Sequence, residues 1–233
     1  MAVQKDFSET RAAILQSRGS ELSHPFAEAF PVDGAAVSVL AGPASGLTLS
    51  ASDEVAVRLD ELQFDLGEGP CWTALAHRNP VLMNPHTDRA EWPAFSEAVA
   101  TDVIGSRVGA MFAFPLAIGT LDIGAIDLYS GDDRPLAPEL VAQASTLADI
   151  AAWRVLRTIL EDHGQPYDSE SIGYSRREVH QATGMIIVQL GVTPADAELL
   201  LRAHAFSAGR SVRDIARDVV DRRLDFGTRG GDS

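Results

Sequence analysis

The sequence holds a single cysteine, Cys71, and a single lysine, Lys5, among its 233 residues. One cysteine excludes an intrachain disulfide, and it also excludes the cysteine clusters that bind structural zinc or iron–sulfur centres. A free thiol is typical of the reducing cytoplasm. We therefore expect a cytoplasmic protein whose fold depends on its hydrophobic core.

Long apolar runs and a secretory leader are also missing from the sequence. No stretch of about 18 consecutive apolar residues occurs, so no transmembrane helix is expected. Residues 1–6 lack the charged and then apolar layout of a signal peptide. With 45% hydrophobic and 22% charged residues, the composition is that of a globular protein without membrane contact, long enough for one large domain or two smaller ones.

Motifs that carry enzyme chemistry are missing as well. The sequence has no glycine-rich phosphate loop, no zinc-ligand spacing and no nucleophile elbow. Since an enzyme needs a nucleophile with its base, or a metal site, we expect a protein that is not an enzyme. No residue pattern indicates a cofactor.

The acidic charge is concentrated in the first part of the chain. A net charge of −14 argues against a nucleic-acid partner if the chain is taken as a whole. Residues 1–170 carry 10 basic and 25 acidic side chains, whereas residues 171–233 carry nine arginines and eight acidic side chains. The C-terminal part is therefore close to neutral and free to bind a phosphate backbone.

Strand and helix patterns alternate in the first part. Apolar residues recur at helical spacing over residues 6–30, and shorter helical stretches follow at residues 71–77 and 92–100. Short apolar runs bounded by glycine or proline predict strands at residues 35–40, 47–52, 81–83, 109–116 and 121–129. The loop between the last two strands contains Gly119, which is typical of a hairpin. We predict an α+β fold with one antiparallel sheet flanked by helices.

A long helix is predicted over residues 138–161, which contain few helix breakers. Its narrow apolar seam has spacings of seven, four, three and four residues and consists of Val141, Ala148, Ala152, Val155 and Ile159. Such a seam is typical of a helix that pairs with a second copy of itself, so a homodimer through residues 138–161 is one interpretation. The alternative is a helix that lies on its own sheet, and the sequence favours neither.

Three short helices are predicted after a break in the helical pattern at residues 161–173. Each begins with a hydroxyl residue followed three positions later by a carboxylate, at residues 175–178, 193–196 and 211–214. Gly191 and Gly209 stand where the first two helices should end. The repeated caps and stops indicate a small three-helix domain.

The pattern of this tail resembles the ANTAR domain of bacterial antitermination regulators. The residues that carry the resemblance are 177–191 and, after them, Ala197, Leu201, Arg202, Ala205 and 214–216. The family pattern usually has a basic residue where this chain has Thr183. The resemblance implies that the tail binds paired RNA hairpins in a leader transcript, as a dimer, so that a terminator cannot form.

The RNA contacts are expected from arginines, whose guanidinium groups bind phosphate, and from side chains that reach loop bases. The RNA-binding residues that we predict are Arg176, Arg177, His180, Thr183, Arg202, Arg210, Arg213 and Arg217, and Arg222 and Arg223 are further candidate phosphate contacts. The alternative for the arginines is structural. Asp214 and Arg217, and likewise Asp218 and Arg222, have the spacing of ion pairs within one helix.

The first part of the chain resembles a GAF domain. The resemblance is carried by residues 35–39, 66–72, Val81, 111–116 and 124–129, and the Glu-Gly-Pro-Cys turn that ends at Cys71 is its most specific piece. It implies a central antiparallel sheet with a pocket for a small ligand on one face. The candidate pocket residues are Cys71, Trp72, His77, Met83 and Met111, and the alternative for each is an ordinary core position.

Together these features predict a signal-responsive transcription antiterminator. A GAF-like sensor domain would cover residues 7–160, a linker residues 161–173 and an ANTAR-like RNA-binding domain residues 174–226. The partners are then hairpin RNA, a small-molecule ligand and a second copy of the chain.

The alternative function is a DNA-binding regulator with a ligand-sensing domain. Residues 205–209, between two short helices, also resemble a helix-turn-helix. The helix that follows offers only Arg210 and Arg213 to read bases, beside three aspartates, and this disfavours the alternative.

Overall fold

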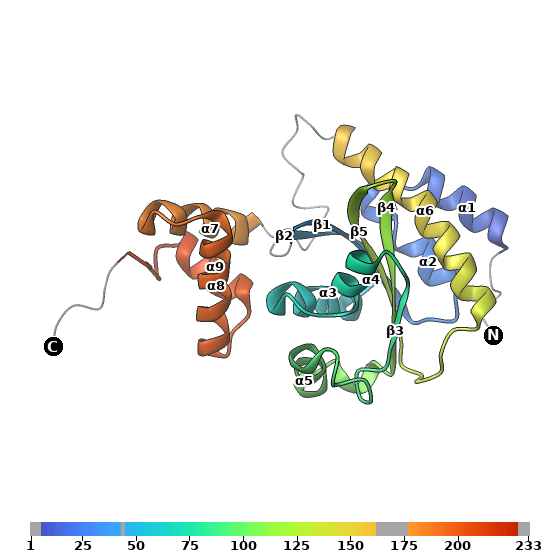
Figure 1. Ribbon diagram of the computed structural model, residues 1–233, viewed down its shortest axis with the longest axis horizontal. Coiled ribbons are helices and arrows are strands. Elements are labelled where there is room, and N and C mark those ends of the chain that lie inside the picture. The colour runs from blue at the N-terminus through green and yellow to red at the C-terminus, as the bar shows by residue number, and fades with distance from the viewer. Residues whose placement is uncertain (1–5, 43–44, 162–176, 228–233) are drawn as a thin grey trace. The chain divides into compact units, whose positions relative to one another are not determined.

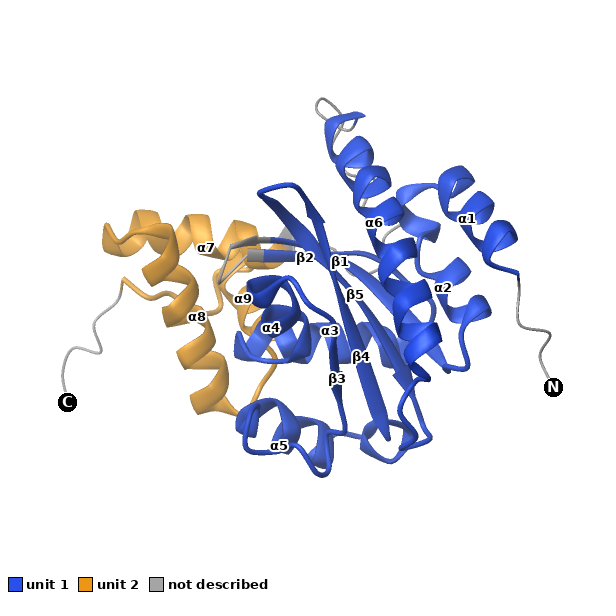
Figure 2. Cartoon of the chain, turned by 45° about the vertical axis from the view of Figure 1, so that its right-hand side comes forward, with its two compact units in different colours: residues 1–174 blue, residues 175–233 orange. Residues whose placement is uncertain are grey.

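The computed structural model describes residues 6–42, 45–161 and 177–227. The chain forms two compact units, residues 1–174 and residues 175–233, which have separate colours in Figure 2. Each unit has a hydrophobic core of its own. The linker predicted at residues 161–173 lies, apart from its first residue, outside the described residues.

The first unit is built on one antiparallel sheet of five strands in the order β2-β1-β5-β4-β3. The strands are β1 (Gly34–Gly42), β2 (Ser45–Ala51), β3 (Val81–Met83), β4 (Ala110–Ile118) and β5 (Leu121–Ser130). β4 and β5 form the predicted hairpin, and Gly119 in its turn has a φ of 58°. The predicted α+β fold class, an antiparallel sheet flanked by helices, is confirmed.

Helices cover both faces of this sheet (Figure 1). One face carries α1 (Phe7–Gln16), α2 (His24–Ala29) and α6 (Pro138–Glu161), and the other carries α3 (Glu54–Leu66), α4 (Pro70–His77) and α5 (Pro93–Thr101). On the first face, Phe112 and Phe114 share a core with the alanines of α6. On the second face, Met111 packs with residues of α3 and α5. Alternating side chains along the strands thus divide the core into two layers.

The N-terminal helical segment is divided where the sequence pattern predicts continuity. The spacing predicts one helix over residues 6–30, whereas the structure has α1, a 3₁₀ turn at Gly19–Glu21 and α2. Ser17 ends α1 in an extended conformation, and Pro25 stands in the first turn of α2. Proline cannot donate to the hydrogen-bond ladder of an ongoing helix, so the helix is interrupted before Pro25. The helical spacing of the apolar residues nevertheless continues across this interruption.

Helix α3 occupies a stretch for which the sequence analysis predicts no element. Its signals are nevertheless present, because Asp53 caps the helix and accepts from the amides of Val55 at 2.8 Å and Ala56 at 3.0 Å. Gly67 ends the helix in the left-handed conformation, with a φ of 65°. A cap and a stop at this separation identify the helix where its apolar period alone does not.

The long helix α6 has the predicted bounds, and its apolar seam faces the sheet of its own chain. Ala148, Ala152 and Val155 are each at most 1% exposed and belong to the same core as Phe112 and Phe114. The interpretation of a helix that lies on its own sheet is therefore confirmed. Because the core of the same chain covers this seam, pairing of α6 with a second copy would require another face of the helix.

The described part of the second unit consists of α7 (Arg177–Leu190), α8 (Pro194–Ala208) and α9 (Val212–Val220). Gly191 and Gly209 follow the first two helices with φ values of 66° and 61°, as their positions predict. The small core of this unit is rich in alanine, which lets short helices approach closely. Its buried residues are Val179, Ala182, Ile186, Ala197, Leu201, Ala205, Val212, Ile215, Ala216 and Val219.

Candidate nucleic-acid interface

Two of the three predicted helix caps lie in the described part of the second unit, and both are formed. The Thr193 hydroxyl accepts from the amide of Asp196 at 3.2 Å, and the Ser211 hydroxyl accepts from the amide of Asp214 at 3.0 Å. The third, at residues 175–178, begins outside the described residues. The caps set where α8 and α9 begin, and therefore which side chains face away from the core.

Three arginines around α9 lie beside carboxylates on the surface. Arg210 donates to Asp218 at 2.7 Å, and Arg223 lies 3.3 Å from the other oxygen of that carboxylate. The hydrogen bond from Arg210 lowers the pKa of Asp218. Arg217 lies 3.4 Å from Asp214, in the ion pair that their spacing predicts.

These pairs do not prevent the arginines from binding RNA. An exposed ion pair contributes about 1 kcal/mol or less, because both partners remain hydrated. Arg210, Arg217 and Arg223 have side chains that are 45%, 47% and 61% exposed. A phosphate oxygen can therefore replace the carboxylate at little cost, and the structural and RNA-binding interpretations are compatible.

The other predicted arginines are less accessible or lie outside the described side chains. Arg213 is half-buried, and its guanidinium lies 3.9 Å from Glu178 of α7. Arg202 is half-buried on α8. Arg177 begins α7, and Arg176 lies outside the described residues.

The structure does not support Thr183 as an RNA contact. This side chain is only 6% exposed, and its hydroxyl donates to the carbonyl oxygen of Val179 at 2.8 Å. The residue therefore faces the core of its own unit. His180 is exposed, and the open side of α7 also carries Gly184 and Val188, the latter 85% exposed.

The pocket residues predicted for the first unit are divided among two core clusters and the surface. Met83 and Met111 lie opposite each other in the β3–β4 ladder and belong to one cluster. Cys71 is fully buried in another cluster, against which Trp72 packs. His77 is exposed at the end of α4. The structure thus brings together two pairs of these residues but not all five.

A buried polar cluster on the second face of the sheet escapes the sequence prediction. Asp60 of α3 is fully buried and accepts from the hydroxyls of Ser38, at 2.6 Å, and Thr48. Asp127 of β5 is 7% exposed and accepts from the Gln63 side-chain amide at 2.6 Å. The sequence signal is that Asp127 stands between the apolar residues Ile126 and Leu128, where a buried carboxyl group costs free energy unless its polar atoms are satisfied.

At this buried cluster, the pKa values of Asp127 and of the Cys71 thiol are both raised. Burial raises the pKa of Asp127 to about 8, and the charge of Asp60 adds to this rise, whereas the hydrogen bond from Gln63 opposes it. Burial, with the charges of Asp127 and Asp60, also raises the pKa of the Cys71 thiol. Cys71 is therefore protonated at neutral pH and is a poor nucleophile.

In residues 6–42, 45–161 and 177–227, no three side chains of His, Cys, Asp or Glu are grouped so as to hold a metal ion. None of the described helices, taken singly, has both the length and the hydropathy needed to cross a membrane. Helices α7 and α8 reach these values only as a pair bent by 108°.

Comparison with known proteins gives a family for the second unit. Residues 174–220 match the family model of the ANTAR domain. Because this range includes α7, α8 and α9, the ANTAR resemblance predicted for the tail is confirmed. A comparison with curated proteins found no match.

Solved structures similar to this chain include three that match 66–70% of its length. One is the GAF domain of the Acinetobacter phosphoenolpyruvate-protein phosphotransferase, with 12% identity, a TM-score of 0.49, and coverage of 70% of this chain and 95% of that one. Another is the phycoerythrobilin-bound GAF domain of a cyanobacterial phytochrome, with 12% identity, a TM-score of 0.49, and coverage of 69% and 100%. A third is the free methionine-R-sulfoxide reductase of Neisseria meningitidis in complex with its substrate, with 12% identity, a TM-score of 0.49, and coverage of 66% and 89%.

Proposed function

We propose that this protein, whose residues 174–220 form an ANTAR domain, is a transcription regulator that binds RNA hairpins through that domain and acts as an antiterminator. The match over α7, α8 and α9 is the observation that carries the proposal. The exposed guanidinium groups around α9 supply the phosphate contacts that RNA binding needs. The function requires no chemical turnover, so we propose a regulator that is not an enzyme.

The first unit would act as the sensor. Its sheet separates two core layers, and a ligand that binds one layer can change the packing of α6 on the other. Since α6 is the last described element before the ANTAR domain in the chain, such a change would reach the RNA-binding unit through it. Control of RNA binding by a small molecule at the first unit is therefore part of the proposal.

A homodimer through the outer face of α6 is also part of the proposal. Thr146, Trp153 and Leu160 follow one another at intervals of seven residues, so they share one face of the helix. Trp153 is 62% exposed and Leu160 is 59% exposed. Leu15 on the neighbouring α1 is 53% exposed. A hydrogen bond of 2.8 Å from Arg154 of α6 to the carbonyl oxygen of Ser17, at the end of α1, joins the two helices. Large apolar groups gathered in this way are typical of a surface that a partner covers.

The dimer is expected to dissociate when a charge is placed on this face. The wild-type protein should sediment as a dimer, and Trp153→Glu as a monomer at the same concentration, because a buried unpaired carboxylate opposes association. Leu121→Glu, at an exposed leucine of the β4–β5 hairpin, is the matched control and should sediment as the wild type. A wild type that is monomeric at every concentration, or a dimeric Trp153→Glu, would refute this surface.

The phosphate contacts are tested by the salt dependence of RNA binding. The probe is a pool of RNA hairpins with one constant stem and randomised loops. Arg217→Gln is expected to weaken binding. It should also make the fall of log K with log salt less steep, by about 1 in the magnitude of the slope, because one fewer counterion is released.

The control for this experiment removes a more exposed charge from the first unit. Arg134 has a side chain that is 81% exposed, so Arg134→Gln changes the net charge by the same amount. It should leave the slope unchanged. If Arg210→Gln and Arg217→Gln both keep the wild-type affinity and slope, the residues around α9 are not the RNA-binding surface.

A further inference from the structure

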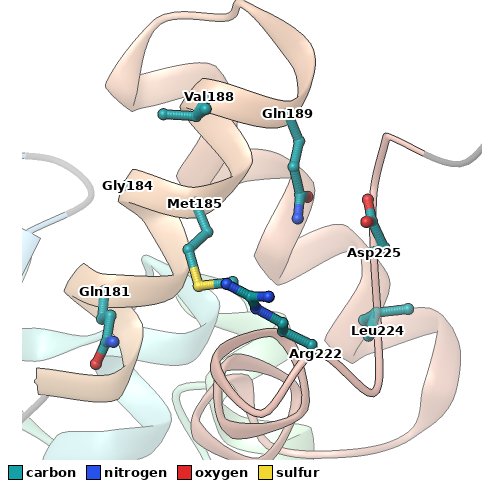
Figure 3. A pocket seen from close by; sticks show the side chains of 8 residues that line it. All are labelled: Gln181, Gly184, Met185, Val188, Gln189, Arg222, Leu224 and Asp225. Atoms are coloured by element: carbon teal, nitrogen blue, oxygen red, sulfur yellow. The ribbon is translucent and has the colours of Figure 1, made fainter.

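The ANTAR-type unit contains a pocket between α7 and the segment that follows α9 (Figure 3). Its volume is about 470 Å³, within the range of small-molecule sites. Met185 and Gln189 extend from α7 into the space that Arg222 enters from the other side. The lining residues are Gln181, Gly184, Met185, Val188, Gln189, Arg222, Leu224 and Asp225. Among them, only Arg222 is also a candidate phosphate contact from the sequence.

Arg222 differs from the other arginines near α9 in having no carboxylate partner. In the part of the chain that the structure describes, its guanidinium makes no hydrogen bond or ion pair, whereas Arg210, Arg217 and Arg223 each lie beside an aspartate. Its backbone has a φ of 57°, a left-handed conformation that is unfavourable for a residue with a side chain. Glycine would satisfy this turn better. A cation without a carboxylate partner among the described residues therefore lines the pocket.

Gly184 leaves the wall of the pocket open in the middle of α7. A Cβ atom at this position would meet no atom within 4 Å, so the packing of the unit does not require glycine. A glycine inside a helix lowers its stability relative to alanine. The bare backbone instead allows a ligand to approach the helix closely.

The remaining lining has the chemistry of a nucleobase site. Met185, Val188 and Leu224 supply an apolar surface on which a flat ring can lie. The side-chain Oε1 of Gln189 accepts from the backbone amide of Phe226 at 3.1 Å, which fixes that side chain and leaves its NH₂ group to donate. Gln181 offers a second amide. Amides of this kind pair with the edges of unstacked bases.

Asp225 distinguishes a base from a simple anion as the ligand. Its Oδ1 accepts from the amide of Gly227 at 2.7 Å, and the lining of the pocket therefore contains a carboxylate as well as the guanidinium of Arg222. An inorganic phosphate would be repelled by this carboxylate. A nucleotide places its phosphate near the arginine and can turn an exocyclic amino group toward the carboxylate.

We infer that this pocket receives one unstacked base from the single-stranded loop of an RNA hairpin, with Arg222 on a neighbouring phosphate. The inference rests on the proposed function and adds to it the place where a loop base is held. Stem contacts through the arginines around α9 would then position the RNA, and the pocket would select hairpins by their loops.

The first test compares affinities of the full chain for the hairpin pool with randomised loops. Gly184→Leu fills the open wall, and Arg222→Asn removes the cation while keeping a residue that tolerates the left-handed conformation. Each is expected to weaken binding about tenfold or more, because stacking of one base on a protein surface contributes that much.

Two matched controls accompany these variants. Ala195→Leu adds the same bulk at an exposed position of α8, and Arg134→Asn removes an exposed arginine of the first unit, away from the RNA-binding surface. Both are expected to bind within about twofold of the wild type. Circular dichroism of each variant shows whether the helices are intact.

The second test observes the pocket directly. The chain has four methionines, so ¹³C-labelled methionine methyl groups give four NMR signals. Of the methionines that the structure describes, only Met185 lines the pocket, and Met83 and Met111 are buried in the other unit, where they serve as internal references. The hairpin pool should shift the Met185 signal, whereas the same stem closed as a continuous duplex, without a loop, should not.

The outcomes separate this inference from the proposed function. If the wild type binds the hairpin pool but Gly184→Leu and Arg222→Asn bind equally well, and the Met185 signal does not move, the pocket is not a base site and the RNA-binding function stands. A Met185 shift of equal size with the loop-free duplex would also overturn the inference. If the wild type binds no RNA, the proposed function itself fails.

Discussion

The free energy of unfolding of the first unit is expected to fall as the pH rises from about 4 to about 8. The cause is Asp127 of β5, which is 7% exposed and lies on the side of the sheet that α3 covers. One carboxyl oxygen accepts from Gln63 at 2.6 Å, and the other has no hydrogen-bond partner among the described residues. An ionised carboxylate in this position is poorly solvated, and the charge of Asp60 opposes it further.

The direction of the effect follows from the pKa of this group in the two states. Folding raises it from 3.8 to about 8, so the folded protein keeps a proton that the unfolded chain loses above about pH 4. Stability is therefore greatest below the lower value and is lost as the pH rises through the window between the two values. Over that window the slope approaches on the order of 1 kcal/mol per pH unit.

Asp127→Asn is expected to remove this dependence, because an amide has the shape of the protonated acid and does not ionise. At pH 8 the variant should be more stable than the wild type by several kcal/mol, and at pH 5 the difference should be much smaller. Urea unfolding followed by the fluorescence of Trp72 and Trp92, at both pH values, measures this. Equal pH slopes for the variant and the wild type would show that Asp127 is not the titrating group.

Gly124→Ala is expected to disrupt the sheet at its centre. Gly124 of β5 lies opposite Val39 of β1 and Leu116 of β4. A Cβ atom would lie 1.8 Å from the carbonyl oxygen of Ser38 and 3.0 Å from the Cα atom of Val39. Since these are backbone atoms within a hydrogen-bonded ladder, the strands must separate to admit the methyl group. We expect a loss of about 3 kcal/mol or more in the free energy of unfolding.

A second glycine in the same hairpin is the control for this change. Gly119 has a positive φ, but a Cβ atom there would have no neighbour within 4 Å. Gly119→Ala should therefore cost only the conformational strain, about 1–2 kcal/mol. Urea unfolding compares the two variants. If Gly124→Ala costs no more than Gly119→Ala, the close approach of β1 and β5 does not constrain the sheet.

The sequence predicts most of the elements whose signals are local. The β4–β5 hairpin, the bounds of α6, and the caps at Thr193 and Ser211 all follow from patterns a few residues long. Such patterns act within one element and do not depend on what packs against it. The α+β class follows from the order of these elements.

The sequence does not predict which surface covers a given apolar face. The seam of α6 fits a second copy and the sheet equally well, and only the fold shows that Ala148 and Ala152 are buried against the sheet. In the same way, Thr183 occupies a position at which the family pattern suggests RNA, but helix packing turns it inward.

The sequence does not show which charged side chains lie close together in the fold. Asp127 and Asp60 are far apart in the chain, and only the fold places them close enough for their charges to interact. Arg222 is one of several arginines near the C-terminus, and its free guanidinium depends on which neighbours take the aspartates. Pairing of this kind is set by three-dimensional geometry, which sequence spacing does not determine.

A competition experiment with the full-length wild type tests the central claim, that the C-terminal unit binds hairpin RNA, most directly. A labelled RNA hairpin pool with randomised loops is bound at constant salt and challenged with unlabelled hairpin RNA or with duplex DNA of the same length. We expect the hairpin RNA to displace the probe at concentrations at which the duplex DNA does not, because the site receives an unstacked base. Equal or stronger displacement by duplex DNA would contradict the account and favour a DNA-binding regulator.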